Sequence, residues 1–473
     1  MNMKATYSKR NFIKSSLLTT VLLLFSSSLF ANWSISDSGV LSISSDADFT
    51  LNSQQQYPWT ERKIEISKVV IENGVKTIGK KAFARFENLE AIVIPASVTK
   101  IDTSAFAGCI SLTNVKLPAN LTTIGKSAFL GCESLKAITI PQSVSKIEKG
   151  VFALCISLNN IKLPNSLQSI DSAAFSGCKS LKSIILPNSI KSIGKAAFAD
   201  CSELNTIKLP TSISQIDSLT FSFCSALSSI KLSASLTTIQ TKAFVGCESL
   251  KTISIPASVK KIGAYAFQDC SKLTSVNIPD IITEIDSFVF SGCDDLSTIK
   301  LPATVTKIGA NAFNGCSNLK EFTIPGKVTS IGAFAFSNCS KLTTIEIPES
   351  VTSIGAFAFQ MCKSLKSLKL SKNAAINPNT FFSCNRLNNV KFGDVSCTLI
   401  SEEAQGSAHV KEIKTGDATS IVISVIEYDG YKFDKWDDGD TNMTRELPFT
   451  SDIVKAASFK QAEAPAQEGV LTE

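Results

Sequence analysis

Cysteine thiols are the side chains of this sequence with the most versatile chemistry, and thirteen of its fourteen cysteines recur at a fixed spacing. The first twelve are 23 residues apart, and the thirteenth follows after 22 residues. The thirteen are Cys109, Cys132, Cys155, Cys178, Cys201, Cys224, Cys247, Cys270, Cys293, Cys316, Cys339, Cys362 and Cys384. Thiols can form disulfides, bind metals or act as nucleophiles, so each chemistry must be weighed against simple packing.

The regular spacing favours buried free thiols over the other three roles. Equivalent cysteines on adjacent repeats would lie about 5 Å apart, within disulfide range, but thirteen identical positions predict a ladder instead of pairs. Zinc sites need short C-x-x-C or H-x-x-x-H spacings, which are absent, and the only histidine, His409, lies outside the repeats. We therefore expect small hydrophobic packing groups, with disulfides as the alternative, and no catalytic, cofactor or metal site.

A phenylalanine three residues before each cysteine keeps the same period. The series begins at Phe83, where Phe86 takes the cysteine position, so the chain holds fourteen copies of one unit. A period of 20–50 residues indicates units that bury their apolar side chains only by stacking on one another. The core ladder that we predict begins with Phe106, Cys109, Phe129, Cys132, Phe152 and Cys155.

Within a unit, the apolar pattern predicts three segments. Residues 115–117 alternate apolar and polar types, which is typical of a short strand. Pro118 ends this strand, as a proline does in eleven of the units, and residues 121–124 form a second extended piece. Apolar positions in residues 128–135 follow the face of a helical turn or two. The prediction is an α/β repeat solenoid of about fourteen 23-residue coils with one parallel sheet.

The repeated pattern L-x-x-I-x-L-P-x-S-V-x-x-I-G-x-x-A-F-x-G-C-x resembles the BspA-like, or treponemal, leucine-rich repeat, and it fits residues 89–392 nearly throughout. Trp33, Gly39–Leu41 and Pro58-Trp59 are similar to the N-terminal cap of that family. The resemblance implies a right-handed arc. BspA-like proteins are associated with attachment to extracellular matrix components, so the resemblance also implies an adhesin-like role.

The first 31 residues have the pattern of a secretory signal peptide. Lys4, Lys9, Arg10 and Lys14 precede a largely apolar run over residues 17–29, and Ala31 offers a small residue at the cleavage point. An N-terminal membrane anchor is the alternative. No later run is long and apolar enough to span a membrane, so we expect an exported protein, secreted or on the cell surface.

The residue between the two inward positions of each first strand should face solvent. In half of the units it is lysine: Lys116, Lys162, Lys208, Lys231, Lys300, Lys369 and Lys391. Residues 32–393 carry a net charge of +11, whereas residues 394–473 carry −9. We expect this face to bind an extracellular protein, of the host matrix or a neighbouring cell, or an anionic glycan. The alternative is a solvated face whose lysines guard the sheet; few aromatics accompany them, which argues against nucleic acid.

The repeat ends near Phe392, and the chain changes character. Residues 421–426 are a strand candidate, and residues 430–440 carry alternating aromatics and an Asp-Gly turn, which indicate a hairpin. With the closing Ala457-Ser-Phe459, this region resembles an internalin B-repeat module. Asp437, Asp438 and Asp440 suggest calcium, but their spacing does not match an EF-hand loop, so a turn is favoured.

These features predict the organisation and the class of function. We expect a signal peptide at 1–31, an N-terminal cap at 32–66, a solenoid at 67–393, a small β-rich module at 394–460 and a flexible tail at 461–473. The function favoured is a secreted or cell-surface bacterial binding protein. A structural, envelope-organising protein is the alternative, and an enzyme is disfavoured because no catalytic constellation is present.

Overall fold

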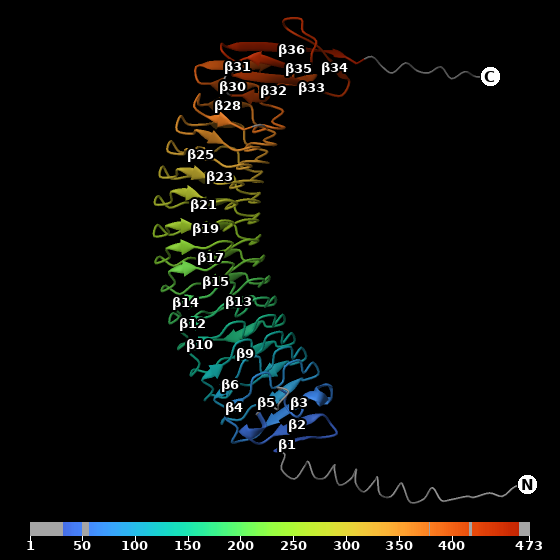
Figure 1. Cartoon of the computed structure of the whole chain (residues 1–473), viewed down its shortest axis with the longest axis vertical. Coiled ribbons are helices and arrows are strands. Elements are labelled where there is room, and N and C mark those ends of the chain that lie inside the picture. Colours follow the sequence, from blue (N-terminus) through green and yellow to red (C-terminus); the bar gives the residue numbers. More distant parts are fainter. Residues whose placement is uncertain (1–31, 50–55, 378, 416–418, 463–473) are drawn as a thin grey trace, which may run out of the picture. The chain divides into compact units, whose positions relative to one another are not determined.

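The computed structural model describes residues 32–49, 56–377, 379–415 and 419–462. The segment predicted as a signal peptide lies outside these residues, as does the predicted tail beyond residue 462. The described chain divides into two compact units. Unit 1 comprises its residues up to Ser145 together with Cys155–Pro164, and unit 2 comprises Lys146–Leu154 and its residues from Asn165 onward. In each unit the chain winds into coils of about 23 residues (Figure 1).

Unit 1 contains the first strands of the first five coils and the second strands of the first three. A coil has a first strand, along which side chains alternate between inward and outward, and a second strand of two residues on another side. The first strands are β3 (Lys68–Ile71), β5 (Ala91–Val93), β7 (Asn114–Val115), β9 (Ala137–Thr139) and β11 (Asn160–Lys162). The second strands are β4 (Thr77–Ile78), β6 (Lys100–Ile101) and β8 (Thr123–Ile124). Before them come β1 (Trp33–Ile35), β2 (Val40–Ile43) and the 3-10 helices η1 (Asp46–Phe49) and η2 (Thr60–Glu65).

Unit 2 continues the same two series of strands. The first strands are β13 (Ser183–Ile184), β15 (Thr206–Lys208), β17 (Ser229–Lys231), β19 (Thr252–Ser254), β21 (Ser275–Asn277), β23 (Thr298–Lys300), β26 (Thr344–Glu346), β28 (Ser367–Leu370) and β30 (Asn389–Phe392). The second strands are β10 (Lys146–Ile147), β12 (Ser169–Ile170), β14 (Ser192–Ile193), β16 (Gln215–Ile216), β18 (Thr238–Ile239), β20 (Lys261–Ile262), β22 (Glu284–Ile285), β24 (Lys307–Ile308), β25 (Ser330–Ile331), β27 (Ser353–Ile354) and β29 (Ala375–Ile376).

The end of unit 2 is β-rich and is built directly onto the last coil. Its strands are β31 (Val395–Ile400), β32 (Gly406–Lys414), β33 (Ser420–Glu427), β34 (Tyr431–Trp436), β35 (Thr444–Pro448) and β36 (Ile453–Gln461). Strand β31 pairs antiparallel with β30, and the order β30-β31-β36-β34 carries the coil sheet onward (Figure 1). Strands β32, β33 and β35 form a second sheet. Cys397, which is off the 23-residue period, is fully buried on β31.

The predicted solenoid is confirmed, but its sheet is divided. The first strands of adjacent coils are parallel and in register, so that Ile207 pairs with Ile230, for example. They do not form one continuous sheet: β13-β15-β17 and β19-β21-β23 are separate three-stranded sheets, and the second strands make sheets of their own. Strands of two or three residues contribute few hydrogen bonds each, so the ladder depends on the packing beneath it.

In the described coils, a corner segment of turns takes the place of the predicted helical turns. The backbone N–H groups of Leu219, Phe221 and Phe223 donate to the carbonyl oxygens of the next coil, at residues 241, 243 and 245, over 2.7–3.2 Å. The backbone of Leu219 and Phe223 adopts the left-handed conformation, with φ of 62° and 57°. Alternate N–H groups therefore point along the stack instead of back into a helix. The same apolar spacing suits both geometries, which is why the sequence pattern indicated a helix.

The core of each unit is a column of phenylalanine rings beside a column of thiols. In unit 2 successive rings from Phe152 to Phe381 stack at centroid distances of 5.2–5.7 Å. All thirteen periodic cysteines are buried thiols, and each thiol donates to the carbonyl oxygen of a phenylalanine one coil earlier, over 3.0–3.3 Å. The six core residues named from the sequence, Phe106, Cys109, Phe129, Cys132, Phe152 and Cys155, are all fully buried.

An aromatic cluster covers the first ring of the column in unit 1. Trp59 is fully buried, stacks on Phe83 at 6.0 Å and donates from Nε1 to the carbonyl oxygen of Ala82. Tyr57 stacks on Trp59 at 5.3 Å, and its hydroxyl donates to the carbonyl oxygen of Lys80. Burial raises the pKa of Tyr57 to about 12. The cluster shields apolar surface that the first coil would otherwise leave open.

Candidate functional site: the exposed side of the first strands

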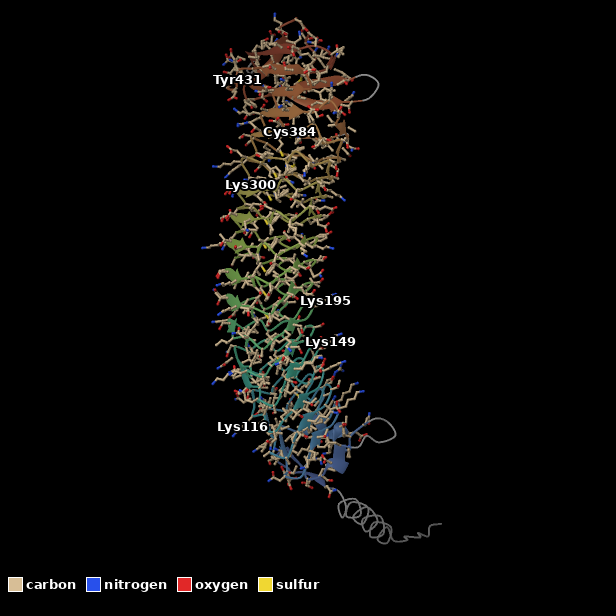
Figure 2. The ribbon with its side chains drawn as sticks, turned by 90° about the vertical axis from the view of Figure 1, so that its left-hand side faces the viewer. Lys116, Lys149, Lys195, Lys300, Cys384 and Tyr431 are labelled. Atoms are coloured by element: carbon tan, nitrogen blue, oxygen red, sulfur yellow. The ribbon has the colours of Figure 1, made fainter. Side chains whose placement is uncertain are left out.

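The strand face is the row of outward side chains near the C-terminal ends of the first strands. All seven lysines predicted for it are exposed, Lys116 and Lys162 in unit 1 and the other five in unit 2. In unit 2, Lys300 points away from the side of the molecule that carries Lys149 and Lys195 (Figure 2). The strand face is thus separate from the corner segments, where Lys149 and Lys195 lie.

Lys208 and Lys231 are direct neighbours on paired strands. The register of β15 and β17 places one beside the other, about one strand spacing, roughly 4.8 Å, apart at the backbone. Within the described chain neither lysine forms an ion pair. Like charges at adjacent positions of a sheet destabilise it. This pair therefore holds positive charge that an anionic group from outside could neutralise.

The other cations of the strand face have different surroundings. Lys369 lies between Glu346 and Lys391 in the parallel register, and it forms an ion pair with Glu346. Lys300 lies beside Asn277 and has no ion-pair partner in the part of the chain that the structure describes. Of the five unit 2 lysines, the structure therefore brings Lys208 and Lys231 together as an uncompensated pair and leaves Lys369 compensated.

A groove opens on this side at one of the breaks in the ladder of first strands. Strand β23 pairs with β21 on one edge only, and the following coil joins β26 through the single bridge Glu321–Thr344. The cavity is about 560 Å³ and is lined by both neighbouring coils, including Ile299, Lys300, Glu321, Phe322, Thr323 and Pro325. A second cavity of about 370 Å³ shares Glu321, Phe322 and Thr323. The lining combines apolar side chains with one cation and one carboxylate.

The corner segments of unit 2 carry aromatic side chains that the sequence analysis did not single out. Tyr265 and Phe288 stack at 4.5 Å, Phe334 and Phe357 stack at 5.0 Å, and Lys242 Nζ lies 5.0 Å from the centroid of Tyr265. All five have positive φ, which bulky residues rarely adopt. The available signal was their shared position, two residues before each core phenylalanine.

The ionisable groups of the C-terminal strands are occupied by one another. Asp438 accepts from Arg445 and Lys455, and these cations lower the pKa of its carboxyl. Arg445 Nε also lies 2.9 Å from Asp440, so side-chain cations fill the position suggested for calcium. In the described residues no group of three or more His, Cys, Asp or Glu side chains is placed to hold a metal ion.

His409 is a buried base on β32. Its side chain is 8% exposed, and Nδ1 has no hydrogen-bond partner within the described chain. Burial lowers its pKa to about 4, and Lys411 adds to the shift. The imidazole is therefore neutral at neutral pH, and we find a packing role for it within the sheet of β32, β33 and β35.

Comparison with known proteins identifies the family. The model of the BspA-type leucine-rich repeat region matches at residues 61–179, 145–274, 237–355 and 306–426. The chain belongs to the BspA-type leucine-rich repeat family. The matched range ends within the C-terminal strands, and their similarity to an internalin B-repeat stays a prediction.

Solved structures of bacterial leucine-rich repeat proteins are similar to this chain. A leucine-rich repeat protein from Bacteroides ovatus is 34% identical, with a TM-score of 0.62 over 69% of this chain and 84% of that one. A leucine-rich repeat protein from Eubacterium ventriosum is 21% identical, with a TM-score of 0.49 over 75% of this chain and 96% of that one. A leucine-rich cell surface protein from Faecalibacterium prausnitzii is 24% identical, with a TM-score of 0.39 over 76% and 92%. No curated protein matches the chain.

Among the described helices, none has the length and apolar character needed to cross a membrane.

Proposed function

We propose that this BspA-type protein is a secreted or cell-surface binding protein whose strand face holds an acidic extracellular protein. The observation that carries the proposal is the uncompensated pair Lys208 and Lys231, held side by side on paired parallel strands. Such a pair reduces the stability of the free sheet and becomes favourable when a partner supplies carboxylates. Membership in a leucine-rich repeat family supports protein interaction as the general role.

Export is the second part of the proposal, and it rests on the sequence. Basic residues precede an apolar run and a small residue near position 31, which is the pattern of a signal peptide. Protease shaving of intact source cells, followed by mass spectrometry, tests this part. Release of peptides from residues 89–392 is the expected result. Protection until the envelope is broken would place the protein inside and favour an envelope-organising role.

The binding role is non-enzymatic in this proposal, because contacts are spread along a repeated surface. Its test is retention of the purified protein on a solubilised extracellular-matrix preparation. We expect the double variant Lys208→Glu with Lys231→Glu to lose at least tenfold in apparent affinity. The matched control is Lys149→Glu with Lys195→Glu, which makes the same change of charge on the opposite side of unit 2 (Figure 2).

The control experiment separates the strand face from net charge. Both double variants lower the net charge equally, so equal losses would mean non-specific attraction and would overturn the strand-face assignment. Retention on heparin in place of the matrix proteins would change the partner class to an anionic glycan. Unchanged thermal unfolding of both variants confirms that the fold is intact.

A further inference from the structure

One coil of unit 2 departs from the repeat on the strand face. Phe322 takes the inward position that isoleucine, valine or leucine fills in every other coil. The residue before it, Glu321, is the single acidic residue found at its repeat position. Sites where a sequence breaks its own local rules are expected at functional or strained positions. Both departures line the groove between β23 and β26.

Phe322 packs beside the stacked phenylalanine column at this break in the ladder. Its ring meets Phe313 and Phe336 edge-on, at centroid distances of 5.0 and 4.7 Å, beside the stacked column. A phenyl ring needs more room than the isoleucine side chain at this position of other coils. The strand residues of this coil keep one bridge, to Thr344, and none to β23.

The opening exposes apolar surface that other coils bury. Ile299 is half-buried, whereas the equivalent inward residue of every other described coil is buried. Phe322 is 7% exposed and forms the other part of the floor. Among the described strands, β23 has no ladder partner on this side. An apolar cavity beside an unpaired strand edge suits a peptide with a side-chain anchor.

The charges around the floor define which peptide fits. Lys300 and Glu321 both line the cavity, and in the described part of the chain neither has an ion-pair partner. Glu346 lines the adjoining cavity but is already paired with Lys369. A polyanion such as a nucleic acid or a sulfated glycan would meet the Glu321 carboxylate. A segment that carries one charge of each sign satisfies both side chains.

We propose that this groove binds an extended segment of a partner protein, in which an apolar side chain enters the cavity between an acidic residue at Lys300 and a basic residue at Glu321. The inference rests on the proposed function, because it names the partner chemistry of one part of the strand face. The row at Lys208 and Lys231 then supplies general attraction, and the groove supplies sequence selectivity.

The test uses a library of displayed random heptapeptides and the full chain. Selection should enrich peptides with one large apolar residue flanked by opposite charges. Synthetic copies of the enriched peptides are then measured by fluorescence polarisation against two variants. Thr323→Trp fills the groove from its exposed rim and should weaken binding more than tenfold. Thr139→Trp places the same side chain at the same repeat position on β9, where the ladder is paired on both sides, and should have no effect.

A second variant does not depend on filling the groove. The charge exchange Lys300→Glu with Glu321→Lys alters two solvent-facing residues and should reverse the order of charges in the selected peptides. Failure to enrich any peptide, enrichment without opposite charges, or binding unaffected by both variants would overturn the proposal.

The outcome is distinguishable from failure of the proposed function. If matrix retention falls when the charges of Lys208 and Lys231 are reversed, but no peptides are enriched, the groove inference fails and the proposed function stands. If peptides are enriched but the protein is not retained on the matrix preparation, the proposed function fails and the groove stands as a peptide site.

Discussion

The thiol of Cys132 donates a hydrogen bond over 3.2 Å to the carbonyl oxygen of Phe106, which lies one coil earlier. The same oxygen accepts the backbone N–H of Cys109 within its own coil, also over 3.2 Å. One carbonyl therefore closes a turn and joins two coils. Alanine would supply no donor at this position, and serine would bury a more polar group. The fixed spacing of cysteine is thus explained by packing and hydrogen bonding together.

The first prediction concerns thiol reactivity and alkaline stability. Burial raises the pKa of Cys109, Cys155 and Cys224 from 9.0 to about 12. Their contribution to stability is complete below pH 9 and is lost as pH rises from 9 towards 12, because the unfolded thiols ionise first. Each such thiol removes about 1.4 kcal/mol per pH unit in that range. Urea unfolding between pH 7.5 and 10.5 should show a steep fall in the midpoint.

Chemical labelling provides the control for this prediction. The native protein at pH 7.5 should leave the periodic cysteines unmodified by a bulky maleimide, and the denatured protein should react at all fourteen. Rapid labelling of the native form, or fewer than fourteen reactive thiols after denaturation without reductant, would contradict the free-thiol assignment.

The second prediction concerns Gly246, which lies beneath Phe223 of the preceding coil. A β carbon at Gly246 would lie 2.6 Å from Cδ1 of Phe223, and φ here is +71°. Gly246→Ala should lower the free energy of unfolding by about 2–4 kcal/mol, from backbone strain and overpacking together. Gly315→Ala is the matched control: φ is +78°, but the nearest atom is 3.5 Å away, so about 1–2 kcal/mol is expected. Urea titration of both variants measures the difference.

A double variant identifies the source of the excess. Adding Phe223→Ala to Gly246→Ala removes the side chain that the new methyl group would meet. Phe223 is 55% exposed, so its own truncation should cost little. The excess over the Gly315→Ala control should then disappear. An excess that persists in the double variant would show that the contact with Phe223 is not its cause.

The period of the sequence was enough to predict the solenoid and the buried positions, but not the path of the corner. Ala128, Phe129 and Cys132 satisfy the spacing of a helical face, and the same spacing arises when alternate N–H groups bond to the next coil. Residues with a left-handed backbone conformation occur along the corner, and only some of them are glycine. Leu219 and Phe223 have positive φ although bulky side chains do not favour it. Contacts between coils impose this conformation, and a single unit of sequence does not contain them.

The candidate site was predictable in outline and not in detail. Alternation of apolar and polar residues was enough to expect Lys208 and Lys231 on the outside of their strands. Compensation of Lys369 by Glu346 depends on the register between coils, which the repeat length could have suggested. The groove lies where Phe322 packs edge-on against Phe313 and Phe336, and these ring contacts arise only in three dimensions.

The third prediction concerns the acid response of the C-terminal strands. Burial lowers the pKa of His409 to about 4 from its ordinary 6.5, so its stabilising effect is complete above pH 6.5 and is lost as pH falls towards 4. The full loss is about 3 kcal/mol. Hydrogen exchange of peptides from β32 and β33 should accelerate over this range. His409→Leu should remove most of the acceleration, and an unchanged pH profile in that variant would exclude His409 as the cause.

The last prediction connects stability and binding at the strand face. Lys231→Glu places a carboxylate beside Lys208, in the register that joins Glu346 to Lys369 on the same face. The free energy of unfolding should rise by about 0.2–1 kcal/mol, and the gain should shrink in 1 M salt. Glu346→Lys is the converse control and should lower stability. If the row serves binding, Lys231→Glu should also weaken matrix retention, so stability and binding change in opposite directions. If the lysines only protect a solvent-exposed sheet from association with other chains, Lys231→Glu should change stability in the same way and leave matrix retention unchanged.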